Sequence, residues 1–184
     1  EKLLSKSTEL SICMSCAVGF GIAAIARVFV PLFFGEGYEK CVNLLVLFVP
    51  VLFVKSLSNV VDQQYLIPAK CDNQYTLAVT GGAIVNLICN GLLIPQLGSV
   101  GATLGTLMAE LSVLIVSAHC AKKEIRFFRM FSRYSHYLLF GLIMFIAVRL
   151  LDSYTHIERS FIRLILMIMI GGGVYSLLCL TVWL

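Results

Sequence analysis

Charged residues are scarce in this chain. Only 13% of its 184 residues are Asp, Glu, Lys or Arg, which is about half the share of an average soluble domain. The apolar set makes up 59% of the residues and the mean hydropathy is +0.94, and a soluble domain of this size could not hide so much apolar surface. The same numbers exclude a disordered, a collagen-like or a repeat-solenoid chain. The composition therefore predicts an integral membrane protein.

The sequence also lacks the motifs of an enzyme or of a metal site. It contains no H-E-x-x-H, no G-x-S-x-G and no phosphate-cradling glycine loop. Cys13 and Cys16 form a C-x-x-C, but no second Cys/His pair follows at zinc spacing and no βαβ pattern surrounds it. We therefore expect no covalent catalysis, no bound metal and no cofactor.

Six apolar stretches occupy most of the chain. Each is close to or above the ~20 residues that a helix needs to cross ~30 Å of hydrocarbon, and none alternates strictly as a strand of a membrane barrel would. Pro95 and Gly98 bound a tight turn, so the helices on either side of it are predicted to be antiparallel neighbours. The predicted helices cover residues of about 10–34, 41–66, 76–95, 100–121, 134–151 and 161–184.

Lysine and arginine predict the orientation of these helices, because cytoplasmic loops carry an excess of both. Eight basic residues fall on one side of the predicted membrane and three or four on the other, which makes both ends of the chain cytoplasmic. Five of the eight lie between the fourth and fifth helices, in a segment whose phenylalanines could also stack on nucleic acid. Its place between two apolar runs favours a cytoplasmic loop on anionic lipid. These five are Lys122, Lys123, Arg126, Arg129 and Arg133.

Three charged residues lie well away from the ends of predicted membrane helices, where charge is costly and marks functional candidates. At 1.5 Å per residue, Glu110 lies roughly 15 Å deep, Lys55 roughly 21 Å and Arg27 roughly 10 Å. An unpaired carboxylate near the midplane would be neutralised by desolvation, so Glu110 is either a proton or cation site or the partner of Lys55. Lys55 and Arg27 could attract an anionic substrate, although Arg27 can also snorkel to the headgroups.

Polar uncharged residues add a second group of candidates. Asn86 and Asn90 share one face of the third helix, and Asn86 lies at the depth of Glu110, so an interhelical hydrogen bond is geometrically open. The alternative is that these residues only clip two helices together. Three more polar residues near the inner end of the second helix are predicted to be interfacial or to line a mouth: Asp62, Gln63 and Gln64.

The fourth helix carries a stripe of small residues. They recur every four positions, a spacing that permits close packing between membrane helices. We therefore expect the third and fourth helices to approach closely. The stripe consists of Gly101, Gly105 and Ala109.

Three segments resemble a known family: LFFGEGYEK, SLSNVVDQQYLIPAKCDNQY and GAIVNLICNGLLIPQLGSVGATLGTLMAE. They are similar to the carboxyl-terminal domain of Wzx-like polysaccharide flippases, in the multidrug/oligosaccharidyl-lipid/polysaccharide exporter superfamily. The resemblance covers residues of about 3–125. It implies a MATE-like transporter of two lobes with alternating access and a cationic central cavity. Because the first residue is Glu1, we expect this chain to be the carboxyl-terminal part, without the amino-terminal lobe.

The resemblance implies a function in the bacterial cytoplasmic membrane. We expect a transporter, not an enzyme, that flips undecaprenyl-pyrophosphate-linked repeat units for capsule, exopolysaccharide or O-antigen synthesis. Expected partners are the lipid-linked oligosaccharide, membrane lipids, a coupling H⁺ or Na⁺ and the rest of its own chain, but no nucleic acid. Alternatives are a lipid II flippase, a cation-coupled drug exporter or an assembly module. A membrane glycan polymerase or acyltransferase should show a large extracytoplasmic loop, whereas the longest here has about ten residues.

Overall fold

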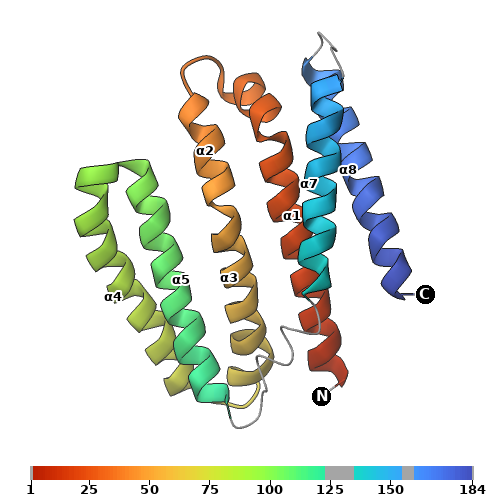
Figure 1. Cartoon of the computed structure of the whole chain (residues 1–184). Helices are drawn as coiled ribbons and strands as arrows, with labels where there is room; N and C mark the ends of the chain where they lie inside the picture. Colours follow the sequence, from red (N-terminus) through yellow and green to blue (C-terminus); the bar gives the residue numbers. More distant parts are fainter. Residues whose placement is uncertain (1, 123–134, 155–159, 184) are drawn as a thin grey trace. The chain divides into compact units, whose positions relative to one another are not determined.

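The computed structural model describes residues 2–122, 135–154 and 160–183. Within them the chain is helical and contains no strand. Six helical segments are long and apolar enough to cross a membrane (Figure 1). This confirms the predicted all-α membrane class. The six segments are Lys6–Phe34, Glu39–Leu66, Asp72–Leu97, Ser99–Ala121, His136–Tyr154 and Phe161–Val182.

Five of the six segments are continuous α-helices. The first begins before the predicted Leu10, because the preceding Lys, Leu and Glu residues are themselves good helix formers. The third runs past Pro95 and ends before Gly98, whose φ of 56° is a conformation that suits glycine. The five helices are α1 (Lys2–Phe34), α4 (Asp72–Leu97), α5 (Ser99–Ala121), α7 (His136–Tyr154) and α8 (Ser160–Trp183).

The second predicted helix, residues 41–66, is not one continuous α-helix. It consists of α2 (Glu39–Leu47), α3 (Val49–Val61) and a π-helical turn, η1 (Asp62–Leu66). The interruption at Phe48 comes two residues before Pro50, whose ring clashes with a carbonyl of the preceding turn and which has no N–H to donate. The predicted membrane-length segment is confirmed as Glu39–Leu66, but its α-helical regularity is interrupted near this proline.

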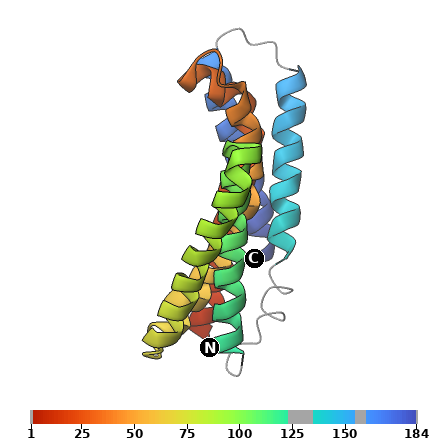
Figure 2. The same cartoon turned by 90° about the vertical axis from the view of Figure 1, so that its left-hand side faces the viewer.

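Close contacts divide the chain into two compact units. Unit 1 comprises Glu1–Cys13 and Pro50–Tyr134, and unit 2 comprises Met14–Val49 and Ser135–Leu184. In unit 1, α4 and α5 lie side by side as an antiparallel pair, and η1 contacts both (Figures 1 and 2). The α3 helix is tied to the beginning of α1 by a hydrogen bond of 3.0 Å from Ser56 Oγ to the carbonyl oxygen of Ser11.

A stripe of buried small residues on α5 explains how closely unit 1 packs. A Cβ on Gly101 would collide with the main chain at Leu93 of α4, and one on Gly105 would collide with the side chain of Asn90. Four residues rotate a helix by about 400°, so successive members of the stripe are displaced by about 40° around α5. The stripe therefore begins against α4 and ends beside η1. Its buried members are Gly101, Gly105, Ala109, Val113, Ser117 and Ala121.

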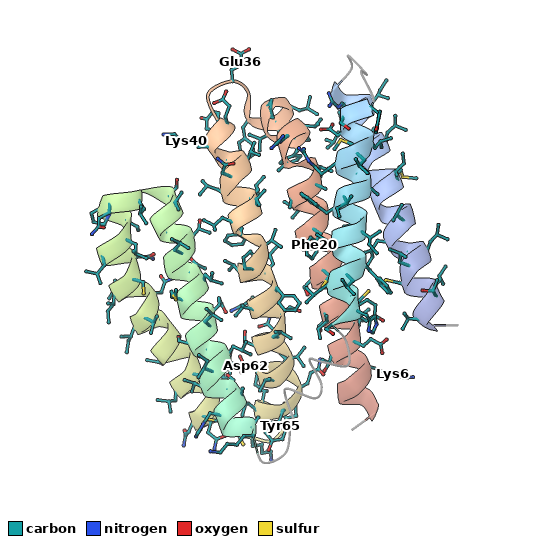
Figure 3. The ribbon with its side chains drawn as sticks, in the orientation of Figure 1. Lys6, Phe20, Glu36, Lys40, Asp62 and Tyr65 are labelled. Atoms are coloured by element: carbon teal, nitrogen blue, oxygen red, sulfur yellow. The ribbon has the colours of Figure 1, made fainter. Side chains whose placement is uncertain are left out.

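Unit 2 contains a charge cluster between α7 and α8. Arg163 Nε donates to Asp152 Oδ1 at 2.9 Å, and Arg163 Nη2 donates to the main-chain carbonyl oxygen of Asp152 at 3.1 Å. Arg149, one turn before Asp152, lies 3.6 Å from the other carboxylate oxygen. Elsewhere in this unit, a Cβ on Gly141 of α7 would collide with the ring of Phe20 on α1; Phe20 is labelled in Figure 3.

The glycine stripe yields a stability prediction. Gly101→Ala should loosen the α4–α5 pair, because the new Cβ would meet main-chain atoms of Leu93, which cannot rotate away. We expect a loss of about 1–3 kcal/mol in the free energy of unfolding, measured as a lower thermal unfolding midpoint in detergent. Gly91→Ala on α4, where a Cβ would meet nothing within 4 Å, is the matched control. Equal midpoints for the two variants would contradict the prediction.

Candidate functional site

A cavity of about 290 Å³ lies within unit 1, among α3, η1, α4 and α5. All four elements belong to segments that are long and apolar enough to cross a membrane. The sequence analysis named several polar residues on these segments as candidates. Most of them line this cavity. Its lining consists of Lys55, Asn59, Asp62, Gln63, Tyr75, Val79, Gly82, Ala83, Asn86, Ala109, Glu110 and Val113.

The cavity begins near the middle of its helices. Glu110 lies about halfway along the 23 residues of α5, and Asn86 about halfway along the 26 residues of α4. Asp62 and Tyr75 lie instead near the connection between η1 and α4, and Figure 3 shows Asp62 close to that end. The cavity therefore extends from the middle of the helices toward the end that carries this connection.

An ion pair joins α3 to α5 at the cavity. Lys55 Nζ lies 2.9 Å from Glu110 Oε1. The Glu110 side chain is 17% exposed and that of Lys55 is 50% exposed, so the carboxylate is largely withdrawn from solvent while the ammonium still faces the cavity. Of the two interpretations that its depth allows for Glu110, the structure has the arrangement in which Lys55 is its partner.

The two asparagines bond to each other along α4. Asn90 Nδ2 donates to Asn86 Oδ1 at 2.8 Å. The hydrogen bond between Asn86 and Glu110 that equal depth allows is not formed among the residues that the structure describes. Lys55 bonds Glu110 Oε1, and the other carboxylate oxygen, Oε2, is buried without a hydrogen-bond partner. Asn86 lines the cavity, whereas the side chain of Asn90 packs against Gly105.

The three polar residues of η1 have different surroundings. Asp62 lines the cavity but is only 4% exposed, and its Oδ1 is buried without a hydrogen-bond partner. Gln63 also lines the cavity and is exposed. Gln64 is not part of the lining, and its Oε1 is buried without a partner. The sequence spacing is consistent with Asp62 facing the same cavity as Lys55. The two residues are seven positions apart, and residues with that spacing share one face of a helix.

The other candidate cations do not belong to the cavity. Arg27 lies in unit 2, is exposed and forms no ion pair with any described residue. Lys122 is exposed just after α5, with Nζ 3.1 Å from His119 Nε2. The remaining basic residues of the predicted cytoplasmic loop lie outside the described part of the chain: Lys123, Arg126, Arg129 and Arg133.

The cavity also contains residues that the sequence did not single out. Tyr75 brings a phenol from α4, and Asn59 brings an amide from α3. Together with Lys55 and the carboxylates, these groups can hold a polar solute or an ion inside an otherwise apolar protein. Within the described residues no group of three or more His, Cys, Asp or Glu side chains could hold a metal ion.

Comparison with known proteins adds nothing to this geometry. No family model, curated protein or solved structure matches the chain. The role of the cavity therefore has to follow from its own residues and from the segments that resemble the flippases. Those segments contain most of the residues that line it, but not Lys55, Val79 or Val113.

The ion pair predicts rescue by exchange of its charges. Lys55→Glu should destabilise unit 1 because only carboxylates would then line the cavity as charged groups. Glu110→Lys should also destabilise it, because two ammonium groups would then lie next to each other. The double variant restores one charge of each sign. We expect a coupling energy of about 1–3 kcal/mol between the two positions, measured from thermal unfolding midpoints of the four proteins in detergent.

Exposed Lys40 provides a control for this cycle, since it forms no ion pair with any described residue. Lys40→Glu combined with Glu110→Lys should show no coupling. Additive effects of Lys55→Glu and Glu110→Lys would show that the pair contributes nothing to stability.

Proposed function

We propose that the chain is part of a multi-pass membrane transporter that flips lipid-linked oligosaccharide repeat units, and that the cavity of unit 1 contacts the polar part of this substrate. The observation that carries the proposal is the pair of Lys55 and Glu110 in a polar cavity, about halfway along a membrane-length helix. Charged groups at such depth are costly and occur chiefly along the path of a solute or ion. Transporters commonly hold their substrates near the bilayer midplane.

The chemistry of the lining supports an anionic glycan as the substrate. Lys55 has three N–H donors, of which one is directed at Glu110, and its side chain is half exposed, so it retains donors for a phosphate oxygen. Amides from Asn59, Gln63 and Asn86 can bond sugar hydroxyls. The resemblance to the flippases implies undecaprenyl-pyrophosphate-linked units as the substrate. Such units carry a charged pyrophosphate and a polar glycan, which match these two kinds of lining group.

The orientation of the cavity is also part of the proposal. The excess of lysine and arginine places the connection between η1 and α4 on the cytoplasmic side of the bacterial membrane. In this orientation the cavity extends from the bilayer middle toward the cytoplasm. Glu110 then has two roles to test, as the counterion of Lys55 and as a site that couples transport to H⁺ or Na⁺.

Reconstitution of the full-length protein tests the proposed function. Proteoliposomes would be loaded with an undecaprenyl-pyrophosphate-linked oligosaccharide, and a membrane-impermeant lectin would report the glycan that reaches the opposite leaflet. We expect transfer that depends on the protein. Lys55→Met should slow it by at least about tenfold, or about 1.4 kcal/mol in the barrier, because an anion contact is lost.

Two further variants sharpen this test. Lys55→Arg keeps the charge and should retain most of the activity, and Lys40→Met removes an exposed cation outside the cavity and should change nothing. Transfer of lipid II or of a cationic drug without transfer of the oligosaccharide would reject the proposed substrate. Equal rates for Lys55→Met and the unmodified protein would reject the role of the cavity.

A further inference from the structure

The charges that line the cavity do not balance. Among the described residues of the lining, Lys55 alone is basic, while Asp62 and Glu110 are both acidic. Lys55 lies 2.9 Å from Glu110, which leaves Asp62 as the second carboxylate. Asp62 is 4% exposed, and its Oδ1 is buried with no hydrogen-bond partner. A buried carboxylate in this condition is strongly unfavourable unless a positive charge joins it.

A second buried oxygen lies beside Asp62. Ser117 on α5 is 0% exposed, and its Oγ also has no hydrogen-bond partner, although it is close enough to interact with the Asp62 carboxylate. The other ionisable groups near Asp62 are Lys55 on its own helix, Glu110 on α5 and Tyr75 across the cavity on α4. The Ser117 hydroxyl can donate one hydrogen bond to the carboxylate, but no basic side chain forms an ion pair with Asp62 among the described residues.

We propose that Asp62 and Ser117 bind one small monovalent cation, a sodium ion or a proton, and that Lys55 limits the cavity to one such cation by neutralising Glu110. One positive charge balances the lining. A divalent ion would leave an excess positive charge, and Ca²⁺ takes six to eight oxygen ligands, whereas the described residues offer no cluster of three acidic or other metal-binding side chains. Asp62 is also the first residue of the π-helical turn, and such turns are frequent at functional sites.

The proposal moves cation binding from the residue that depth alone favours to a different one. Glu110 is the carboxylate nearer the midplane, but it has a tethered ammonium group as its partner. Asp62 has none. The proposal does not depend on the glycan being the substrate, because cation binding is measured without it. A protein that does not transfer the oligosaccharide could still bind the cation, and that result would reject only the proposed function. A protein that does not bind the cation could still transfer the oligosaccharide, and that result would reject only the cation site.

The test uses the purified full-length protein in lipid nanodiscs. Binding of radioactive Na⁺ would be measured at alkaline pH, and the infrared carbonyl band of a protonated carboxylic acid would be followed at lower pH. We expect one saturable Na⁺ per protein, or an acid band, or both in exchange. Asp62→Asn should weaken Na⁺ binding by at least about tenfold and remove the band. Asp72→Asn, an exposed carboxylate at the start of α4, is the matched control.

The role of Lys55 has its own test in the same assay. Glu110→Gln should weaken cation binding at Asp62, because Lys55 loses its partner and lies on the same face as Asp62. Adding Lys55→Met to that variant should restore binding of one cation. Unchanged Na⁺ binding in Glu110→Gln would overturn the role given to Lys55.

The site itself is overturned by one result. An Asp62→Asn variant that elutes as a single folded species, with unchanged Na⁺ binding and an unchanged acid band, would exclude Asp62 as the binding residue. Should Asp62→Asn fail to fold, Ser117→Ala repeats the test, because it removes one of the two oxygens without adding volume. Unchanged Na⁺ binding and an unchanged band in Ser117→Ala would then overturn the site.

Discussion

A hydrocarbon interior offers no water to a charged side chain, and this constraint determines how unit 1 is built. Glu110 can lie halfway along α5 because Lys55 reaches it from α3 across 2.9 Å. Removing Lys55 would leave the largely buried Glu110 carboxylate without its counter-charge, so the ion pair links α3 to α5. The asparagines, the cavity and the buried Asp62 are all arranged around that pair.

Close packing between α4 and α5 makes the polar arrangement geometrically possible. Gly101 and Gly105 bring the main chains together at one end of the pair, and the side chain of Asn90 fits into the space above Gly105. Farther along, the same stripe turns toward η1 and brings Ser117 beside Asp62. The four-residue repeat therefore contacts two neighbouring elements. Its first part packs against α4, and Ala109 and Val113 in its middle line the cavity.

Hydropathy was sufficient to predict the six membrane-length helices and the antiparallel pair around Gly98, since both depend on local composition. The contacts at the site depend on which neighbouring helix each side chain faces. Counting residues along a helix predicts the depth of a side chain but not that direction. Counting residues put Asn86 and Glu110 at one level, yet Asn86 bonds to Asn90 instead. It also predicted that Asp62 is interfacial or lines a mouth; Asp62 does line the cavity, with a buried side chain. The Lys55 and Glu110 partnership was foreseen as one of two alternatives, because two opposite charges in hydrocarbon have strong reason to meet.

The interruption at Phe48 has a mechanical consequence. The boundary between the two units falls between Val49 and Pro50, next to the place where α2 gives way to α3. An ordinary membrane helix resists bending sharply, because each main-chain hydrogen bond that opens in lipid costs several kcal/mol. Pro50 has no N–H to lose, so flexing at this point opens one bond fewer than it would anywhere else in the segment. A bend at Pro50 therefore costs less main-chain hydrogen bonding than a bend at any other residue of the segment that carries Lys55.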